Sequence, residues 1–213
     1  MADDSAPKPR IRDAEATRAR ILAAAKKEFA TSGLGGARVD VIADQAKANK
    51  RMIYHYFGSK EGLFQTVVED AYIDFRSAEQ ALQLDHLDPK AALEKMVRFI
   101  WGYFLKNPEF ITLVNSENLH RAKHLKASEA VKIYNRRYVD GMAGLLDRGV
   151  QAGVFRTGID PVQLNITIAA IGYYYLTNRF TGSIVFERDF MAKDALEERL
   201  LFNIDTVLRL VAT

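Results

Sequence analysis

Residues 39–64, VDVIADQAKANKRMIYHYFGSKEGLF, contain the pattern that decides the fold. The first eight carry apolar side chains at the i, i+3, i+4 and i+7 spacing of one helical face, which predicts a short amphipathic helix. Lys47-Ala48 then forms a tight connection, and Asn49 can cap a second helix from Lys50 to Phe57. Two short helices joined by a few residues are typical of helix-turn-helix proteins, which place the second helix in the major groove of DNA.

A longer motif surrounds these two helices. It comprises Ile42-Ala43, Ala46, Ile53-Tyr54, Tyr56-Phe57, Ser59-Lys60-Glu61 and Leu63-Phe64, preceded by Thr17-Arg18-x-x-Ile21-Leu22-x-x-Ala25-x-x-x-Phe29-Ala30-x-x-Gly33. Over about residues 12 to 68 the chain resembles the N-terminal region of the tetracycline-repressor (TetR) family of transcription regulators. Two positions depart from the family pattern, because Lys47 replaces the usual turn glycine and Ala37-Arg38 replace the usual capping threonine.

The resemblance implies a DNA-reading surface on the second short helix and beside it. Lys50 and Arg51 occupy positions of base-edge contacts, where an Arg can bond guanine O6 and N7 together. Tyr54 and His55 occupy positions suited to phosphate oxygens or a thymine methyl, and Lys60 one suited to a phosphate. The predicted DNA-binding residues are Arg38, Asn49, Lys50, Arg51, Tyr54, His55, Tyr56 and Lys60. For each, the alternative is an ordinary solvated surface residue, and for Tyr56 also a place in the core.

The charge distribution favours the same region. The net charge of the 213 residues is only +3, but residues 1–60 hold 12 Lys and Arg against 7 Asp and Glu. Residues 61–213 hold 18 against 20, so only the N-terminal third attracts phosphate. The absence of cysteine excludes disulfides, thiolate metal sites and a cysteine nucleophile. Because no signal-peptide pattern and no apolar run of about 20 residues is present, we expect a soluble, cytoplasmic protein.

Helix-forming residues dominate the chain, which has only 13 Gly and 5 Pro, so we expect an all-α protein of about nine helices. Residues 1–12 are expected to form a disordered arm whose Lys8, Arg10 and Arg12 could touch DNA. Residues 13–60 should form the helix-turn-helix domain, and residues 61–213 an effector-binding and dimerisation domain. The remaining predicted helices span about 13–32, 59–84, 89–106, 108–126, 128–151, 161–180 and 189–211.

The resemblance also implies that a small molecule binds among the later helices and changes the separation of two recognition helices. Such a ligand acts only if it binds the two separations unequally. Aromatic side chains with a few polar groups suit a small, partly apolar or aromatic ligand. The candidates are Trp101, Phe104, Asn115, Asn118, Tyr138, Tyr174 and Asn178. Core packing is the alternative for each aromatic residue.

One recognition helix covers half of an operator, so specific binding requires a homodimer with recognition helices about 34 Å apart. The last two predicted helices each have an apolar face, and the resemblance implies a four-helix bundle between two subunits. The predicted interface residues are Leu164, Ile168, Ile171, Gly172, Tyr175, Leu196, Leu200, Ile204, Val207 and Leu208. A core within one chain is the alternative for the same residues.

The sequence contains one candidate group of metal ligands. Glu117, His120 and His124 have a spacing that could hold Zn²⁺ or Ni²⁺ on a helix, but the neighbouring cations favour an exposed polar patch, and no metal or cofactor is predicted. The chain has no Gly-rich phosphate loop, nucleophile elbow or paired catalytic motif, so an enzyme is not expected. The sequence therefore predicts a ligand-responsive, homodimeric repressor of a palindromic operator. A DNA-binding protein of the same fold under the control of a protein partner is the alternative.

Overall fold

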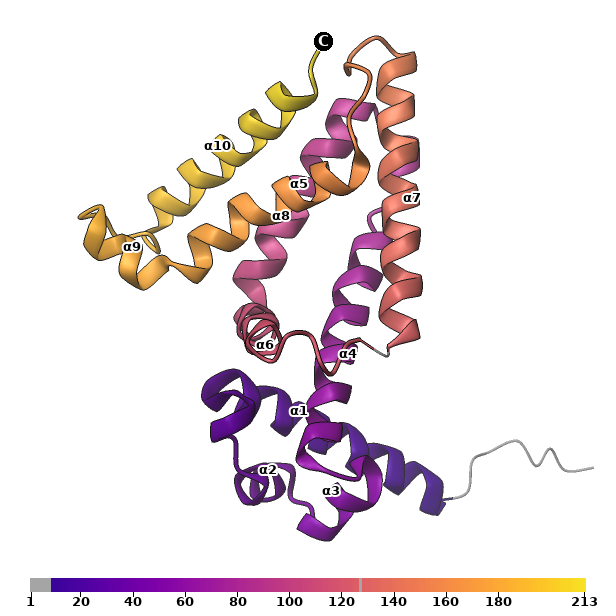
Figure 1. Cartoon of the computed structure of the whole chain (residues 1–213), viewed down its shortest axis with the longest axis vertical. Helices are drawn as coiled ribbons and strands as arrows, with labels where there is room; N and C mark the ends of the chain where they lie inside the picture. The colour runs from indigo at the N-terminus through magenta and orange to yellow at the C-terminus, as the bar shows by residue number, and fades with distance from the viewer. Residues whose placement is uncertain (1–8, 127) are drawn as a thin grey trace, which may run out of the picture. The chain divides into compact units, whose positions relative to one another are not determined.

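The computed structural model describes residues 9–126 and 128–213, with side chains from Asp13 onward. These residues contain ten α-helices and one 3-10 helix, η1, which confirms the predicted all-α class (Figure 1). The helices are α1 (Pro9–Gly36), α2 (Val39–Ala46), α3 (Lys50–Phe57), α4 (Lys60–Gln80), η1 (Leu84–His86), α5 (Pro89–Lys106), α6 (Pro108–Leu119), α7 (Glu129–Gln151), α8 (Pro161–Thr177), α9 (Arg179–Val185) and α10 (Lys193–Val211).

The predicted bounds of α2 and α3 agree with the structure, whereas several others need correction. The helix predicted over 59–84 ends at Gln80, and the one predicted over 189–211 begins at Lys193. Helix α1 begins at Pro9 rather than Asp13 and continues through a kink at Gly33, whose φ is 64°. Helix α6 ends at Leu119, and turns follow as far as residue 126. The expected break at Thr181-Gly182 lies inside α9. The predicted contacts of Lys8, Arg10 and Arg12 lie outside the described residues and side chains.

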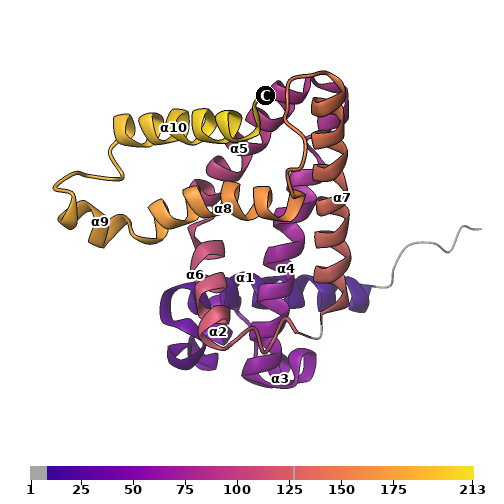
Figure 2. The same ribbon diagram turned by 45° about the horizontal axis from the view of Figure 1, so that its top comes forward.

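The chain divides into two compact units. Within the described residues, the first runs as far as Ala71 and includes Thr112–Ser128, and the second comprises Tyr72–Ile111 and Glu129–Thr213. The predicted boundary was residue 60, whereas α4 belongs to the first unit as far as Ala71. The first unit brings together α1, α2, α3 and the start of α4 (Figure 2). Its core includes an edge-to-face contact between Phe29 and Phe64, whose ring centroids lie 5.1 Å apart.

The second unit is built around α5, which packs against α7, α8 and α10. Helices α5 and α8 both begin at an Asp-Pro pair, and the carboxylates of Asp88 and Asp160 accept backbone N–H bonds of the first turn. An aromatic cluster fills the region between α4, α5 and the start of α6. Its members are Phe75, Phe99, Tyr103, Phe104 and Phe110. None of the helices in the described ranges is long and apolar enough to cross a membrane.

Candidate nucleic-acid interface

The turn between α2 and α3 fixes the direction of α3. Lys47 adopts the left-handed conformation, with φ 49° and ψ 45°, that a glycine usually supplies at such a turn. The Oδ1 atom of Asn49 accepts the backbone N–H of Arg51 at 2.9 Å, as predicted for an N-cap. Ile53 is fully buried and anchors one face of α3, and Gly58 ends the helix with φ 73°. The opposite face of α3 is therefore directed away from the core.

That opposite face carries three of the predicted DNA-binding side chains. Arg51, Tyr54 and His55 are spaced at i, i+3 and i+4, and all three are exposed. Tyr54 retains 44% of its accessible surface although it is a large, partly apolar residue. The guanidinium of Arg51 forms no ion pair with a carboxylate in the described part of the chain. These three side chains are thus available to a base edge or a phosphate.

Lys50 is engaged within the chain. Its Nζ atom lies 2.5 Å from Oδ1 of Asp40 on α2, and both side chains are about half exposed. Their hydrogen bond raises the pKa of the Lys50 ammonium and lowers the pKa of the Asp40 carboxyl. Lys50 therefore gives one of its three N–H donors to Asp40.

Of the four other predicted DNA-binding residues, Lys60 and Asn49 form side-chain hydrogen bonds within the chain. The Lys60 ammonium donates to the carbonyls of Ala37 at 3.3 Å and Gly35 at 3.5 Å, so it links the start of α4 to the end of α1 and the connection to α2. Asn49 uses its side-chain oxygen as the α3 cap. Arg38 precedes α2 without a side-chain cap and keeps an exposed guanidinium, and Tyr56 is half-buried.

A second group of cations in the first unit was not predicted. Arg20, Lys27 and Lys47 line a shallow pocket of about 340 Å³ between α1 and the end of α2. Arg20 Nε donates to the carbonyl of Ala46 at 3.1 Å, which holds this cation at the helix end. The seven-residue spacing of Arg20 and Lys27, two turns along one face of α1, was the signal that could have indicated the group.

Glu117 and His124 are buried, so the predicted exposed patch is wrong for both residues. Glu117 retains 2% and His124 6% of their accessible surface. Oε2 of Glu117 accepts a hydrogen bond from Nδ1 of His124 at 2.7 Å, while Nδ1 of His120 lies 2.7 Å from the carbonyl of Ser116. Across the described ranges, no three or more His, Cys, Asp or Glu side chains are grouped so that they could hold a metal ion.

The predicted effector residues do not converge on one site. Trp101 and Phe104 are core residues, with Trp101 packed edge-to-face on Tyr175. Asn118 and Asn178 donate to carbonyls of their own helices, those of Val114 and Tyr174. Asn115 belongs to the first unit, as Asn118 does. Tyr138 and Tyr174 each line a pocket, but the two pockets are different.

The pocket beside Tyr138 lies between the end of α4, η1, α5 and α7 and has a volume of about 180 Å³. Its wall contains Glu79, a residue that the sequence did not bring to notice. Glu79 is 4% exposed and pairs with Arg76, and burial raises the pKa of its carboxyl to about 7 although Arg76 opposes this shift. Its position four residues after Phe75 on the buried face of α4 was the available signal.

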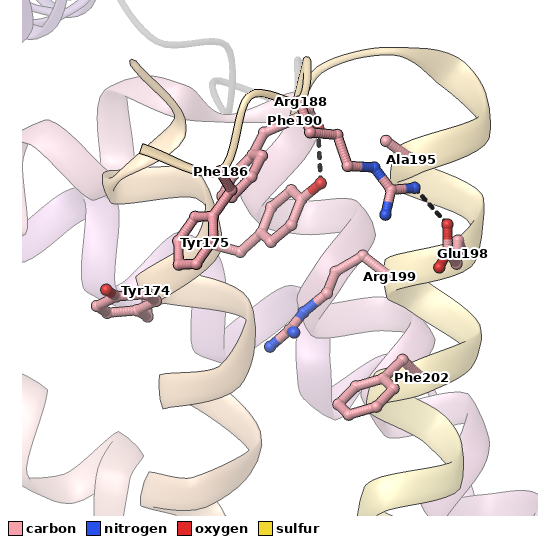
Figure 3. A pocket seen from close by; sticks show the side chains of 9 residues that line it. All are labelled: Tyr174, Tyr175, Phe186, Arg188, Phe190, Ala195, Glu198, Arg199 and Phe202. Carbon is pink, nitrogen blue, oxygen red and sulfur yellow. Dashed lines mark hydrogen bonds and ion pairs between the residues drawn. The ribbon is translucent and has the colours of Figure 1, made fainter. Parts of the chain in front are cut away.

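The pocket beside Tyr174 lies between α8, α10 and the segment that joins α9 to α10, with a volume of about 370 Å³ (Figure 3). The rings of Tyr175 and Phe190 stack at 4.4 Å, and the Tyr175 hydroxyl donates to the Phe190 carbonyl at 3.0 Å. Arg188 pairs with Glu198 across the rim (Figure 3). Three lining aromatics remain largely exposed, namely Tyr174, Phe186 and Phe202.

The predicted dimer residues fall into two groups. Five of them, Leu164, Ile168, Gly172, Ile204 and Val207, are buried in the core of their own chain. They offer no surface to a partner subunit, so the prediction is corrected for these five. The reason is that this face of α8 and α10 packs against α5. Partial exposure remains at Ile171, Tyr175, Leu196, Leu200 and Leu208. The exposed apolar residues of these helices, of α9 and of the segment between α9 and α10 are Val162, Ile166, Tyr174, Phe180, Ile184, Val185, Phe186, Met191, Leu201, Phe202 and Leu210.

Comparison with protein families matches both parts of the chain. Residues 21–67 match the bacterial regulatory proteins of the tetR family, and residues 89–207 match the tetracyclin repressor-like C-terminal domain. The HTH-type transcriptional repressor NicS of Pseudomonas putida is 40% identical over 200 residues, which cover 94% of each chain. The HTH-type transcriptional repressor SCO4008 of Streptomyces coelicolor is 32% identical over 75% of this chain and 78% of its own.

Solved structures have the same fold. The Streptomyces coelicolor transcriptional regulator SCO4942 superposes with a TM-score of 0.68 at 26% identity, over 92% of this chain and 98% of that chain. A Mesorhizobium loti protein described as a TetR-family regulator superposes with a TM-score of 0.65 at 19% identity, over 95% and 99% of the two chains, which supports the fold alone.

Proposed function

The chain belongs to the tetR family of bacterial regulatory proteins, and on that premise we propose that it is a sequence-specific repressor released from DNA by a small molecule. Membership makes the chain a helix-turn-helix transcription regulator rather than an enzyme. The proposal adds the reading of bases by α3, a homodimer on a palindromic operator, and an effector bound in the second unit.

The observation that carries the proposal is the exposed face of α3. Arg51 and Tyr54 project from a helix whose start is capped by Asn49 and whose other face is anchored by Ile53. A rigid backbone matters because a bidentate Arg–guanine contact requires a fixed approach to the base edge. The local excess of Lys and Arg over residues 1–60 adds attraction to phosphate.

A homodimer supplies the second recognition helix that a palindrome requires, about 34 Å from the first. The exposed apolar side chains of α8, α9 and α10 support this part of the proposal, because a large exposed apolar patch usually marks an interaction site. We place the partner subunit on this surface, with Tyr174 and Phe202 among the contact residues. The buried face of α8 takes no part in it.

The test is binding of the purified chain to the DNA upstream of its own gene, measured by fluorescence anisotropy against a random duplex at several salt concentrations. We expect tighter binding to the upstream DNA and a loss of that preference in Arg51→Ala. Loss of a bidentate contact worth about 1–3 kcal/mol weakens each half-site roughly 5- to 150-fold. Arg136→Ala, which removes an exposed Arg from α7, is the matched control and should bind as the wild type does.

The assignment of α3 as the recognition helix fails if Arg51→Ala and Tyr54→Phe both retain the full preference for upstream DNA. A uniform loss on both duplexes would instead identify Arg51 as a phosphate contact without base readout.

A further inference from the structure

The pocket between α4, α5 and α7 contains a buried ion pair. Arg76 Nη1 lies 2.7 Å from Oε2 of Glu79, and the two side chains are 11% and 3% exposed. The second carboxylate oxygen, Oε1 of Glu79, and the hydroxyl of Tyr138 are buried without a hydrogen-bond partner in the described part of the chain. Buried polar atoms are costly unless they are hydrogen-bonded, so this pair of atoms calls for a ligand or another explanation.

The charged groups around Glu79 come from several elements. Arg76 belongs to the same helix, and it is fixed by Asn135, whose Oδ1 accepts its Nε–H at 2.8 Å, and by the Tyr138 ring at 4.1 Å. Helix α7 also contributes Arg137, which is exposed at the rim. The 3-10 helix contributes the exposed Asp85, which pairs with Arg148. Oε2 already accepts from Arg76, whereas Oε1 has no partner in the described residues, so Oε1 is the oxygen that a ligand would satisfy.

The pocket is small and has an apolar wall, with Gln80, Gln83, Asp85 and Arg137 as further polar lining residues. Met96, Met142 and Leu145 line it beside the ion pair, and its volume is about 180 Å³. A cavity of about 150 Å³ can hold benzene, so this one has room for a single ring. Gly141 leaves space in the wall, since a Cβ atom there would meet nothing within 4 Å.

We propose that this pocket binds the effector, and that the effector is a single-ring molecule with a protonated amine that donates hydrogen bonds to Glu79 and Tyr138. The inference rests on the proposed function and names its ligand class. The terminal torsion of a Glu side chain has a broad energy minimum, so Oε1 can turn toward the ligand at little cost. The ring then packs on the Met and Leu side chains, and the ammonium completes the hydrogen bonds of Oε1 and the hydroxyl.

The charge of the ligand follows from what the pocket leaves unpaired. A carboxylate ligand would face Oε1 of Glu79 across a short distance, and like charges at such a distance repel strongly in a buried site. A neutral ring without a donor would leave Oε1 of Glu79 without a hydrogen bond. An ammonium group offers Oε1 only donors and a charge opposite to that of the carboxylate, which offsets its repulsion from Arg76.

Ligand binding should depend on pH through Glu79. Burial raises the pKa of this carboxyl to about 7, so a proton competes with the amine for the same oxygen. The ionised form binds the amine, and affinity is therefore lost as the pH falls through 7. Between pH 8 and pH 6 the loss should be about tenfold, because the ionised fraction falls by about that factor.

The test is calorimetric titration of the full chain with benzylamine, benzyl alcohol and benzoate at pH 8 and pH 6. Benzylamine should bind more tightly than the other two at pH 8 and lose about tenfold in affinity at pH 6. Glu79→Gln should abolish both the preference for the amine and the pH dependence. Gly141→Leu should block all binding by filling the pocket, while Gly144→Leu, on the same helix but outside the pocket, should not.

Three results would overturn the inference: no saturable benzylamine binding, tighter binding of benzoate, or unchanged amine binding in both Glu79→Gln and Gly141→Leu. These results are independent of the proposed function, because the titration contains no DNA. Specific operator binding without amine binding would remove only the ligand assignment. If the chain binds the amine but shows no preference for the operator, the assignment of the pocket as an amine site stands and the proposed repressor function is rejected.

Discussion

Glu117 and His124 form a buried pair in which both carboxylate oxygens of Glu117 accept hydrogen bonds from His124. Oε2 accepts Nδ1–H of the imidazole at 2.7 Å, and Oε1 accepts the backbone N–H at 2.8 Å. The backbone between them is unusual, since Arg121 and Ala122 both have positive φ, 58° and 54°. A left-handed residue other than glycine costs about 1–2 kcal/mol. Glu117 thus holds a turn that the chain would not otherwise favour.

Replacement of Glu117 should loosen this turn. Glu117→Gln retains an acceptor but loses the charged one, and hydrogen bonds to charged groups contribute about 1.5–3 kcal/mol. We therefore expect a fall of that size in the free energy of unfolding, measured by urea denaturation. Glu129→Gln, which changes an exposed carboxylate at the start of α7, is the control and should change little. Equal urea midpoints for the two variants would show that the pair does not stabilise the turn.

Asp40 should compete with DNA for Lys50. The ammonium of Lys50 lies 2.5 Å from the Asp40 carboxylate in the free chain, and a phosphate or base contact of Lys50 on the proposed recognition helix would weaken this hydrogen bond. Asp40→Asn should therefore tighten DNA binding, most clearly at low salt, where phosphate attraction is strongest. The measurement is the operator dissociation constant across a salt series. Asp44→Asn removes an equally negative, exposed residue of α2, and a gain of the same size in that variant would assign the effect to net charge alone.

Lys47 provides a test of backbone strain. Its φ of 49° lies in the left-handed region, where glycine has no steric penalty. Lys47→Gly should raise the free energy of unfolding by up to about 1 kcal/mol and increase the melting temperature. Lys27→Gly, in the interior of α1, should lower it by about 1 kcal/mol, because glycine is a poor helix former. A melting temperature that falls in both variants would mean that Lys47 is unstrained.

The bounds of a helix could be predicted from the sequence where residues close together in the chain determine them. The bounds of α2 and α3 follow from an apolar period, the Asn49 cap and Gly58, and the starts of α5 and α8 follow from Asp-Pro pairs. All these signals act within a few residues of one another. They are therefore readable without knowledge of the tertiary structure.

The sequence was insufficient where distant residues decide the structure. Helix α8 is apolar on most of its circumference, so Leu164 in the core and Ile166 on the surface look alike in the pattern. The spacing from Phe75 places Glu79 on the buried face of α4, but its proximity to Tyr138, which is far away in sequence, could not be predicted from the pattern. The reversal at Arg121 and Ala122 has no glycine or proline to announce it. In each case tertiary packing overrides local propensity.

A substitution on the exposed face of α10 tests the proposed dimer interface. Phe202 retains 60% of its accessible surface, so its replacement costs the isolated chain little packing. Phe202→Asp should place a charge in the proposed interface, dissociate the dimer and lose operator binding with it. Light scattering after gel filtration measures the mass, and Ile133→Asp, at an exposed apolar residue of α7, is the matched control. A dimer that persists in Phe202→Asp would exclude Phe202 from the contact surface.

Glu79 should make the stability of the chain fall as the pH rises. Burial raises the pKa of its carboxyl from 4.5 to about 7. Between these values the folded state holds a proton that the unfolded state has released, so the free energy of unfolding decreases with increasing pH. The shift corresponds to about 3 kcal/mol, present below pH 4.5 and lost once the pH exceeds 7.

The comparison that isolates this contribution is between the wild type and Glu79→Gln. Gln has no proton to release, so the free energy of unfolding of the wild type should fall relative to the variant by about 3 kcal/mol between pH 4.5 and pH 8. Urea denaturation at several pH values measures the difference. Glu94→Gln, at an exposed carboxylate of α5, should follow the wild type. A constant difference between the wild type and Glu79→Gln over this range would mean that Glu79 ionises as an ordinary carboxylate, held by Arg76 at every pH.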